Sequence, residues 1–148
     1  MTVSAHVPEE VDILEITRAL EENLGTKVDV NLVPTRNPSV TSVTYWWRTA
    51  THGMMRGREA FQFVQLQIEF DNTQELMQID FLCLPEIQKG TGKGRAVVDT
   101  IKRVGQRLGY KKIVIDSIEG SYMFWLRVNF IPTDPFRTSF PRHMVHSL

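Results

Sequence analysis

Three glycines at alternate positions, Gly90, Gly92 and Gly94, constrain this chain more than any other feature. They join a strand-like apolar run, residues 77–84, to an amphipathic helical pattern that ends at Gly109. The glycines therefore lie at a helix N-terminus, where backbone N–H groups have no intrahelical partner and the helix dipole is positive. The sequence predicts a phosphate-binding loop at this turn.

The spacing of the glycines distinguishes three kinds of phosphate loop. A P-loop ends in Gly-Lys followed by Ser or Thr, but Lys93 is followed by Gly94. The dinucleotide fingerprint has the pattern G-x-G-x-x-G and opens a parallel unit. Here the glycines run G-x-G-x-G, and the turn-forming residues 71–74 predict an antiparallel hairpin before the loop. Neither of these two loops fits the chain well.

The third pattern is Q/R-x-x-G-x-G/A between an antiparallel strand and a helix. Residues 89–94 fit this pattern, with Lys89 in place of the first residue. In this respect the stretch resembles the coenzyme A pyrophosphate loop of the GNAT acetyltransferases.

A second part of the chain resembles the same family. Residues 110–117 form a β-branched run that predicts a buried strand. Residues 122–130 then resemble the second GNAT signature, a short helix that ends in a Gly-Phe pair. Asn129 stands in place of that glycine, and Trp125 in place of the tyrosine that commonly protonates the departing thiolate. The resemblance covers residues 77–130 in all.

The resemblance implies a mixed α/β fold of the GNAT acyl-CoA N-acyltransferase type. This fold has a central mixed sheet with antiparallel N-terminal strands, flanked by helices. A length of 148 residues with 42% hydrophobic residues suits a single domain over residues 1–148. The residue patterns predict a helix over residues 8–24 and strands over residues 27–32, 40–51 and 60–70. Prolines after residue 131 predict that any last strand is short and lies at an edge.

The resemblance also implies the donor and the residues that bind it. The chain is expected to acetylate a primary amine with acetyl-coenzyme A and to need no metal. Backbone groups of Cys83 and Leu84 would bind the pantetheine and the thioester oxygen. Ser117 would hydrogen-bond the pantetheine amides or cap the next helix. The pyrophosphate would lie on Lys89, Gly90, Thr91, Gly92, Lys93, Gly94 and Arg95.

Two residues are candidates for the catalytic acid and base. Tyr122 precedes Trp125 by one helical turn, so its hydroxyl is placed either to act as the acid or to pack in the core. Asp80 is the candidate base, with Glu69 as an alternative, because a carboxylate near the thioester would accept a proton through water.

The acceptor is expected to be a small-molecule or peptide amine. The segment 45–56 is rich in aromatic residues and methionine, and it is expected to pack in the core, line an acceptor pocket or form a homodimer contact. Strand alternation puts Trp46 and Trp47 on opposite faces of the sheet, so one of them should be less buried than the other.

Charge and composition bear on location and partners. Seventeen basic and seventeen acidic residues give no net charge, which does not favour nucleic acid or an anionic membrane. No apolar run approaches the ~18 residues of a membrane span. The expected location is cytoplasmic. The alternative to an enzyme is a catalytically inactive GNAT-fold module that binds coenzyme A or a protein partner.

Overall fold

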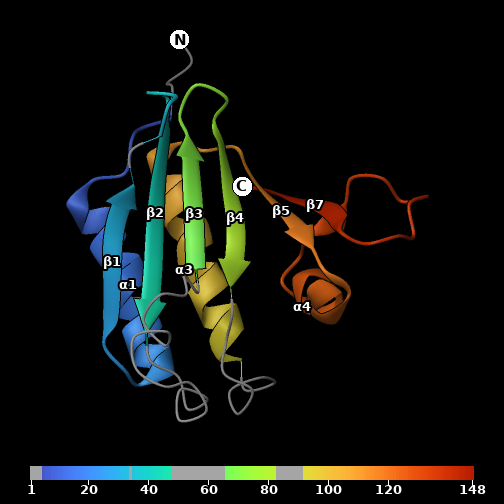
Figure 1. The fold of residues 1–148 in the computed structure, drawn as a ribbon, viewed down its shortest axis with the longest axis horizontal. Helices are drawn as coiled ribbons and strands as arrows, with labels where there is room; N and C mark the ends of the chain where they lie inside the picture. Colours follow the sequence, from blue (N-terminus) through green and yellow to red (C-terminus); the bar gives the residue numbers. More distant parts are fainter. Residues whose placement is uncertain (1–4, 34, 48–65, 83–91) are drawn as a thin grey trace.

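The computed structural model describes residues 5–33, 35–47, 66–82 and 92–148, and Figure 1 shows their arrangement. Residues 48–51 and 60–65 of the predicted strands lie outside these ranges. So do residues 83–91, to which the sequence assigns the end of the strand-like run 77–84 and most of the phosphate-binding loop. The described elements confirm a mixed α/β class. In chain order they are α1 Glu10–Leu24, β1 Val28–Val33, β2 Val40–Trp47, β3 Leu66–Asp71, β4 Leu76–Leu82, α3 Lys93–Leu108, β5 Lys112–Ser117, η3 Glu119–Ser121, α4 Tyr122–Arg127, β6 Ile131–Pro132 and β7 Arg142–Ser147.

The described strands form one seven-stranded mixed sheet in the order β1-β2-β3-β4-β5-β7-β6. Strands β1 to β4 are antiparallel neighbours, β4 and β5 are parallel, and β5, β7 and β6 are again antiparallel. Helix α3 connects the parallel pair, and α1 lies beside it on the same face of the sheet (Figure 1). This confirms the predicted mixed sheet with antiparallel N-terminal strands.

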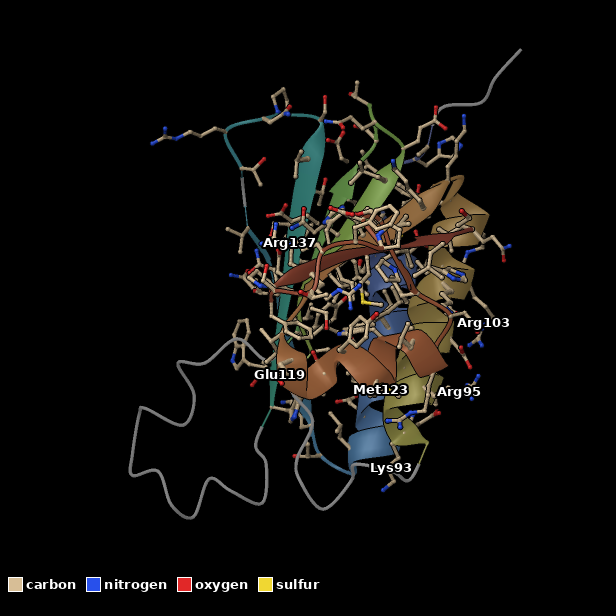
Figure 2. All side chains as sticks on the ribbon, turned by 90° about the vertical axis from the view of Figure 1, so that its right-hand side faces the viewer. Lys93, Arg95, Arg103, Glu119, Met123 and Arg137 are labelled. Atoms are coloured by element: carbon tan, nitrogen blue, oxygen red, sulfur yellow. The ribbon has the colours of Figure 1, made fainter. Side chains whose placement is uncertain are left out.

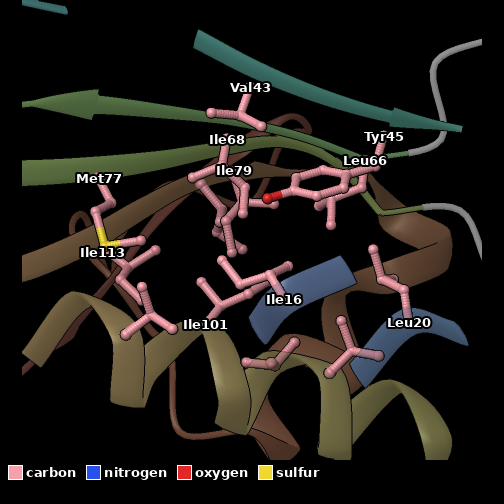
Figure 3. Packing of buried hydrophobic residues seen from close by; sticks show 14 of the residues in the cluster. Ile16, Leu20, Val43, Tyr45, Leu66, Ile68, Met77, Ile79, Ile101 and Ile113 are labelled. Carbon is pink, nitrogen blue, oxygen red and sulfur yellow. The ribbon is translucent and has the colours of Figure 1, made fainter. Parts of the chain in front are cut away.

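The core lies between that face of the sheet and the two helices (Figure 3). Val43, Ile68 and Ile79 from the strands meet Ile16 of α1 and Ile101 of α3, and all five side chains are buried. Removing such a side chain typically costs about 2–5 kcal/mol because a cavity remains. The core therefore fixes α3, and with it the turn at the start of α3, against β4.

Helix α1 begins at Glu10, two residues after the predicted start. Glu9 and Asp12 form a capping box at its N-terminus, and Gly25 ends it with a φ of 68°, which favours glycine. Val11, an apolar residue in the first turn, is 65% exposed. Asp12 is buried instead, and its Oδ1 lies 2.6 Å from Nη2 of Arg107 on α3. The ion pair joins the two helices.

Strand β2 confirms the prediction about the two tryptophans. Trp47 is buried against the core, whereas Trp46 is half-buried and lies on the other face of the sheet. Because β2 occupies an interior position, the strand alternation was sufficient to predict this difference.

The C-terminal segment differs from the prediction. The last strand, β7, has six residues and lies between β5 and β6, so the prediction of a short last strand at an edge is wrong; the two-residue β6 occupies the edge instead. Of the six residues of β7, Met144 alone is fully buried. The strand therefore lacks the apolar alternation by which a strand is recognised in a sequence.

Candidate active site

The sheet divides at Asp80, near the carboxyl end of β4. Asp80 has no register partner on β3, because the register shifts between Gln67 and Ile68. The parallel ladder between β4 and β5 ends at Ile79 and Ile115, while the ladder between β5 and β7 continues beyond that point. A residue left out of a ladder forms a β-bulge, which bends its strand. Strand β4 therefore separates from β5 at Asp80, which leaves backbone groups without a partner strand between them.

Asp80 lies on the face of the sheet opposite α1 and α3, since its neighbour Ile79 points into the core. Burial, together with the negative charges of Glu69 and Asp116, raises the pKa of Asp80 to about 6. Nε2 of Gln78 donates a hydrogen bond of 2.9 Å to Oδ1 of Asp80, which opposes the rise. A carboxylate with a pKa in this range suits general base catalysis near neutral pH.

The N-terminus of α3 has the properties of an anion site. Its N-cap, Gly92, has a φ of 82°, and no side chain caps the helix. The first intrahelical hydrogen bond runs from the N–H of Ala96 to the oxygen of Gly92, so the amides of residues 93–95 have no partner within the helix. Its first turn has no acidic residue, although acidic side chains stabilise this end of a helix and α1 has them there. An external anion would supply the missing negative charge.

The helix start and the bulge lie at the same end of the sheet. In Figure 1, α3 begins below the arrowhead of β4, and α4 follows β5 at that end. Lys93 and Arg95 project from the first turn of α3, near α4 in Figure 2. The structure therefore places a basic helix start near the opening between β4 and β5.

Two basic side chains of α3 bind the C-terminal end of α4. Nη2 of Arg95 donates a hydrogen bond of 3.3 Å to the oxygen of Arg127. Nζ of Lys102 donates to the oxygen of Val128 and lies 5.6 Å from the ring centroid of Phe130. These contacts hold α4 beside α3, because cations bind favourably to helix C-termini. The phosphate-binding role of Arg95 stays a prediction.

Tyr122 is the first residue of α4, and its side chain is half-buried. Its ring packs edge-to-face on Phe140 at a centroid distance of 5.7 Å. The guanidinium carbon of Arg142 lies 4.6 Å from the centre of the same ring. These two contacts fix the orientation of the ring, and the role of its hydroxyl as an acid stays a prediction.

The two departures from the second GNAT signature have structural explanations. Asn129 has a φ of 72°, so the left-handed conformation usually taken by glycine is present here. Trp125 is buried, with its ring 5.1 Å from those of Phe124 and Phe130 in edge-to-face contacts. Trp125 therefore packs in the core and offers no acidic hydroxyl to a leaving group.

Ser117 is fully buried at the end of β5. Its Oγ donates a hydrogen bond of 2.9 Å to the oxygen of Ile118 and lies 3.4 Å from Oγ of Ser121. Neither η3 nor α4 has a side-chain cap, so the predicted capping role is wrong. The hydroxyl instead stabilises the turn after β5, and its predicted contact with pantetheine stays a prediction.

A cavity of about 310 Å³ lies beside the end of β5 and had no counterpart in the sequence analysis. Nδ1 of His143 lies 3.0 Å from Oδ1 of Asp116 at its wall. The cavity is near Asp80, whose pKa responds to Asp116, and near Tyr122, which Arg142 contacts. The charged side chains that line it are Asp116, Asp134, Arg137, Arg142 and His143.

The predicted site residues thus fall into two groups. The structure brings Asp80, Gly92, Lys93 and Arg95 to one end of the sheet, together with Tyr122 and Ser117. Gly94 is buried in the first turn of α3. The remaining predicted residues lie outside the described ranges and stay predictions; they are Cys83, Leu84, Lys89, Gly90 and Thr91.

The described part of the chain offers neither a metal cluster nor a membrane-spanning helix. No group of three or more His, Cys, Asp or Glu side chains is arranged to hold a metal ion there. None of the helices described there is long and apolar enough to cross a membrane.

No protein-family model and no curated protein sequence matches the chain. Solved structures do match it. A domain from Methanocaldococcus jannaschii aligns with 83% of this chain and 99% of its own length, at 11% identity and a TM-score of 0.50. Nourseothricin acetyltransferase aligns over 99% of both chains at 9% identity and a TM-score of 0.49. The GNAT domain of S. lividans PAT covers 78% of this chain and 65% of its own, at 9% identity and a TM-score of 0.48.

At these identities the similarity concerns the fold alone. Within the structure itself, the mixed sheet, its antiparallel N-terminal strands and the helices beside it agree with the fold that the sequence predicted. The architecture is of the GNAT type.

Proposed function

We propose that this protein is an N-acetyltransferase that transfers an acetyl group from acetyl-coenzyme A to a primary amine. The observation that carries the proposal is the bulge at Asp80, where β4 separates from β5 at the same end of the sheet as a basic, uncapped helix start (Figure 1). A gap between parallel strands offers free backbone groups to a thioester. A helix N-terminus beside it offers amides to a pyrophosphate.

In this proposal, the backbone amides of residues 92–95 bind the pyrophosphate. Gly92 lets the phosphates approach closely, since no heavy atom lies within 4 Å of the position that a Cβ would take. Lys93 adds a positive charge to the same turn, where it is unfavourable unless an anion is bound. The arrangement fits an anionic ligand and requires no metal ion to hold it.

The reaction needs a proton acceptor and a proton donor. Asp80 accepts a proton from the ammonium group of the acceptor, and the free amine nitrogen then attacks the carbonyl carbon of the thioester. The C–N bond forms and the C–S bond breaks, and the thiolate takes a proton from the hydroxyl of Tyr122 or from water. The nitrogen then gives up its second proton, which restores that hydroxyl or water and leaves a neutral amide. Holding the two reactants together supplies much of the rate even where the acid is weak.

A coenzyme A-binding module without turnover is the second candidate. It is favoured by Trp125, which stands in place of the usual tyrosine and is packed between two phenylalanine rings. Both candidates keep the helix start of α3, so donor binding does not distinguish them. Turnover does.

Thiol release from acetyl-coenzyme A across a panel of amines tests the proposal. We expect release that depends on both the protein and an amine, and mass spectrometry should find the acceptor heavier by one acetyl group. Butanol, which matches butylamine but lacks the nitrogen nucleophile, is the control. Tight binding of coenzyme A without amine-dependent release would favour the module and contradict the enzyme.

The replacement of Tyr122 by Phe tests the acid. The variant keeps the ring that packs on Phe140 and Arg142, so its melting temperature should match that of the wild type. If the hydroxyl protonates the thiolate, kcat should fall by roughly 10²- to 10⁴-fold with little change in KM for acetyl-coenzyme A. An unchanged kcat would assign Tyr122 to packing and the proton to solvent.

A further inference from the structure

The cavity beside β5 is lined by side chains of both charges. Arg137 and Arg142 contribute guanidinium groups, and Asp116 and Asp134 contribute carboxylates, so the two signs balance. A volume of about 310 Å³ is at the small end of the range for ligand pockets. A small ligand that carries both a positive and a negative group would match this lining.

The guanidinium of Arg142 is oriented but has no carboxylate partner. Its position over the ring of Tyr122, 4.6 Å from the centre, fixes the side chain. Its Nε is buried without a hydrogen bond, and no carboxylate forms an ion pair with Arg142 or Arg137 in the described part of the chain. Nε of Arg137 donates to the oxygen of Ser139 at 3.3 Å, which leaves its terminal nitrogens to a ligand. Planar guanidinium groups bind carboxylates in a bidentate manner.

The opposite charge lies toward the opening between β4 and β5. Asp116 lines the cavity, and it is close enough to Asp80 for its charge to act on that carboxyl group. His143 holds one carboxylate oxygen of Asp116 at 3.0 Å, which leaves the second oxygen to accept from a ligand. An ammonium group beside Asp116 would therefore lie on the side of the cavity from which Asp80 is reached.

We propose that this cavity binds the acceptor, and that the acceptor is a small zwitterion with an amine and a carboxylate. The carboxylate binds the guanidinium groups of Arg142 and Arg137, and the ammonium group lies at Asp116. The assignment of the cavity to an acceptor rests on the proposed acetyl transfer. The pairing of charges rests on the lining alone.

Titration of the free protein with three probes of matched length tests the charge pairing. The probes are 4-aminobutanoate, butylamine and butanoate, and glycine and 6-aminohexanoate extend the series in length. The readout is the NMR signals of His143, identified among the four histidines by their loss in the His143→Gln variant. We expect 4-aminobutanoate to bind about tenfold or more tightly than either single-charge probe, since each end adds a charge-assisted hydrogen bond.

Arg142→Gln and Arg137→Gln separate the two ends of the ligand. Each should weaken 4-aminobutanoate and butanoate by about tenfold and leave butylamine unchanged. The second variant covers the case in which Arg142→Gln fails to fold. Arg18→Gln is the control. It removes an exposed guanidinium on α1, a helix that packs on α3 and β1, and β1 lies at the opposite edge of the sheet from β7. This variant should leave the affinity for every probe unchanged.

The outcomes distinguish this inference from the proposed function. Equal affinity for zwitterionic and single-charge probes at every length, or His143 signals that do not move, would overturn the inference even if other amines are acetylated. Selective binding of a zwitterion that is never acetylated would leave the charge pairing intact and contradict the acetyl transfer. Acetylation of the zwitterion with an increase in KM in the arginine variants would support both.

Discussion

Coenzyme A should bind the Gly92→Asp variant on the order of 100-fold more weakly than the wild type. The substitution puts a negative charge at the N-cap of α3, where the proposal places the pyrophosphate. Two like charges about 4 Å apart repel by roughly 1 to 4 kcal/mol, depending on how far water reaches them, and 1.4 kcal/mol corresponds to a factor of ten. Isothermal titration calorimetry of both proteins with coenzyme A measures the difference.

Gly92→Asn is the matched control for this variant. Asparagine has the shape of aspartate without its charge, and both residues tolerate the left-handed conformation that Gly92 adopts at a φ of 82°. The Asn variant should therefore retain most of the affinity, since the space beside Gly92 is open. If the two variants bind equally well, the pyrophosphate does not lie at this turn.

The fold was predictable where apolar residues recur with a clear period. Val97, Ile101 and Leu108 share one helical face and Gly109 ends it, so α3 was predicted close to its observed bounds. Strand β7 was not predicted, because Met144 alone among its residues is fully buried and Phe140 and Pro141 before it read as a loop. Its place between β5 and β6 depends on pairing across the sheet, which leaves no local pattern in the sequence.

The site was predictable only in part, because it too depends on pairing between strands that are distant in the sequence. Asp80 was a candidate because it lies within the strand-like run that precedes the glycine-rich turn. The sequence alternates through residues 77–81, across the position of the bulge, so it gives no sign of it. The cavity was not predicted, because the register of β5 against β7 brings together Asp116 and His143, which are 27 positions apart in the sequence. The one available signal was Asp116, a carboxylate near the end of the strand predicted over residues 110–117.

Asp80→Asn should lower kcat/KM for the amine by roughly 10²- to 10⁴-fold, because the variant cannot accept a proton. In the wild type, the carboxyl group must lose its proton before it acts, so kcat/KM should rise as the pH increases through about 6. The variant should lack this rise.

Glu69→Gln is the comparison: the charge of Glu69 raises the pKa of Asp80, so its removal should move the rise to lower pH. If Glu69→Gln abolishes the rise and Asp80→Asn keeps it, Glu69 is the base.

Asp80→Asn should also stabilise the fold at neutral pH. Burial raises the pKa of Asp80 from 3.8 to about 6, so the folded protein holds this proton more tightly than the unfolded chain does. The resulting contribution to stability is complete below pH 3.8 and is lost as the pH rises through about 6. A shift of this size corresponds to about 3 kcal/mol, which we reduce to about 1 kcal/mol because the carboxyl group is half-exposed and screened by water.

Calorimetric melting at pH 4 and pH 8 measures this contribution. At pH 8, Asp80→Asn should melt roughly 2–4 °C above the wild type, and the difference should shrink toward pH 4, where the wild-type carboxyl group is protonated when folded. A gain in stability that accompanies a loss of activity is typical of a residue held in an unfavourable environment for its chemistry. An equal melting difference at both pH values would show that the pKa of Asp80 is not raised in the folded protein. Asp80 would then be excluded as a base that works near neutral pH.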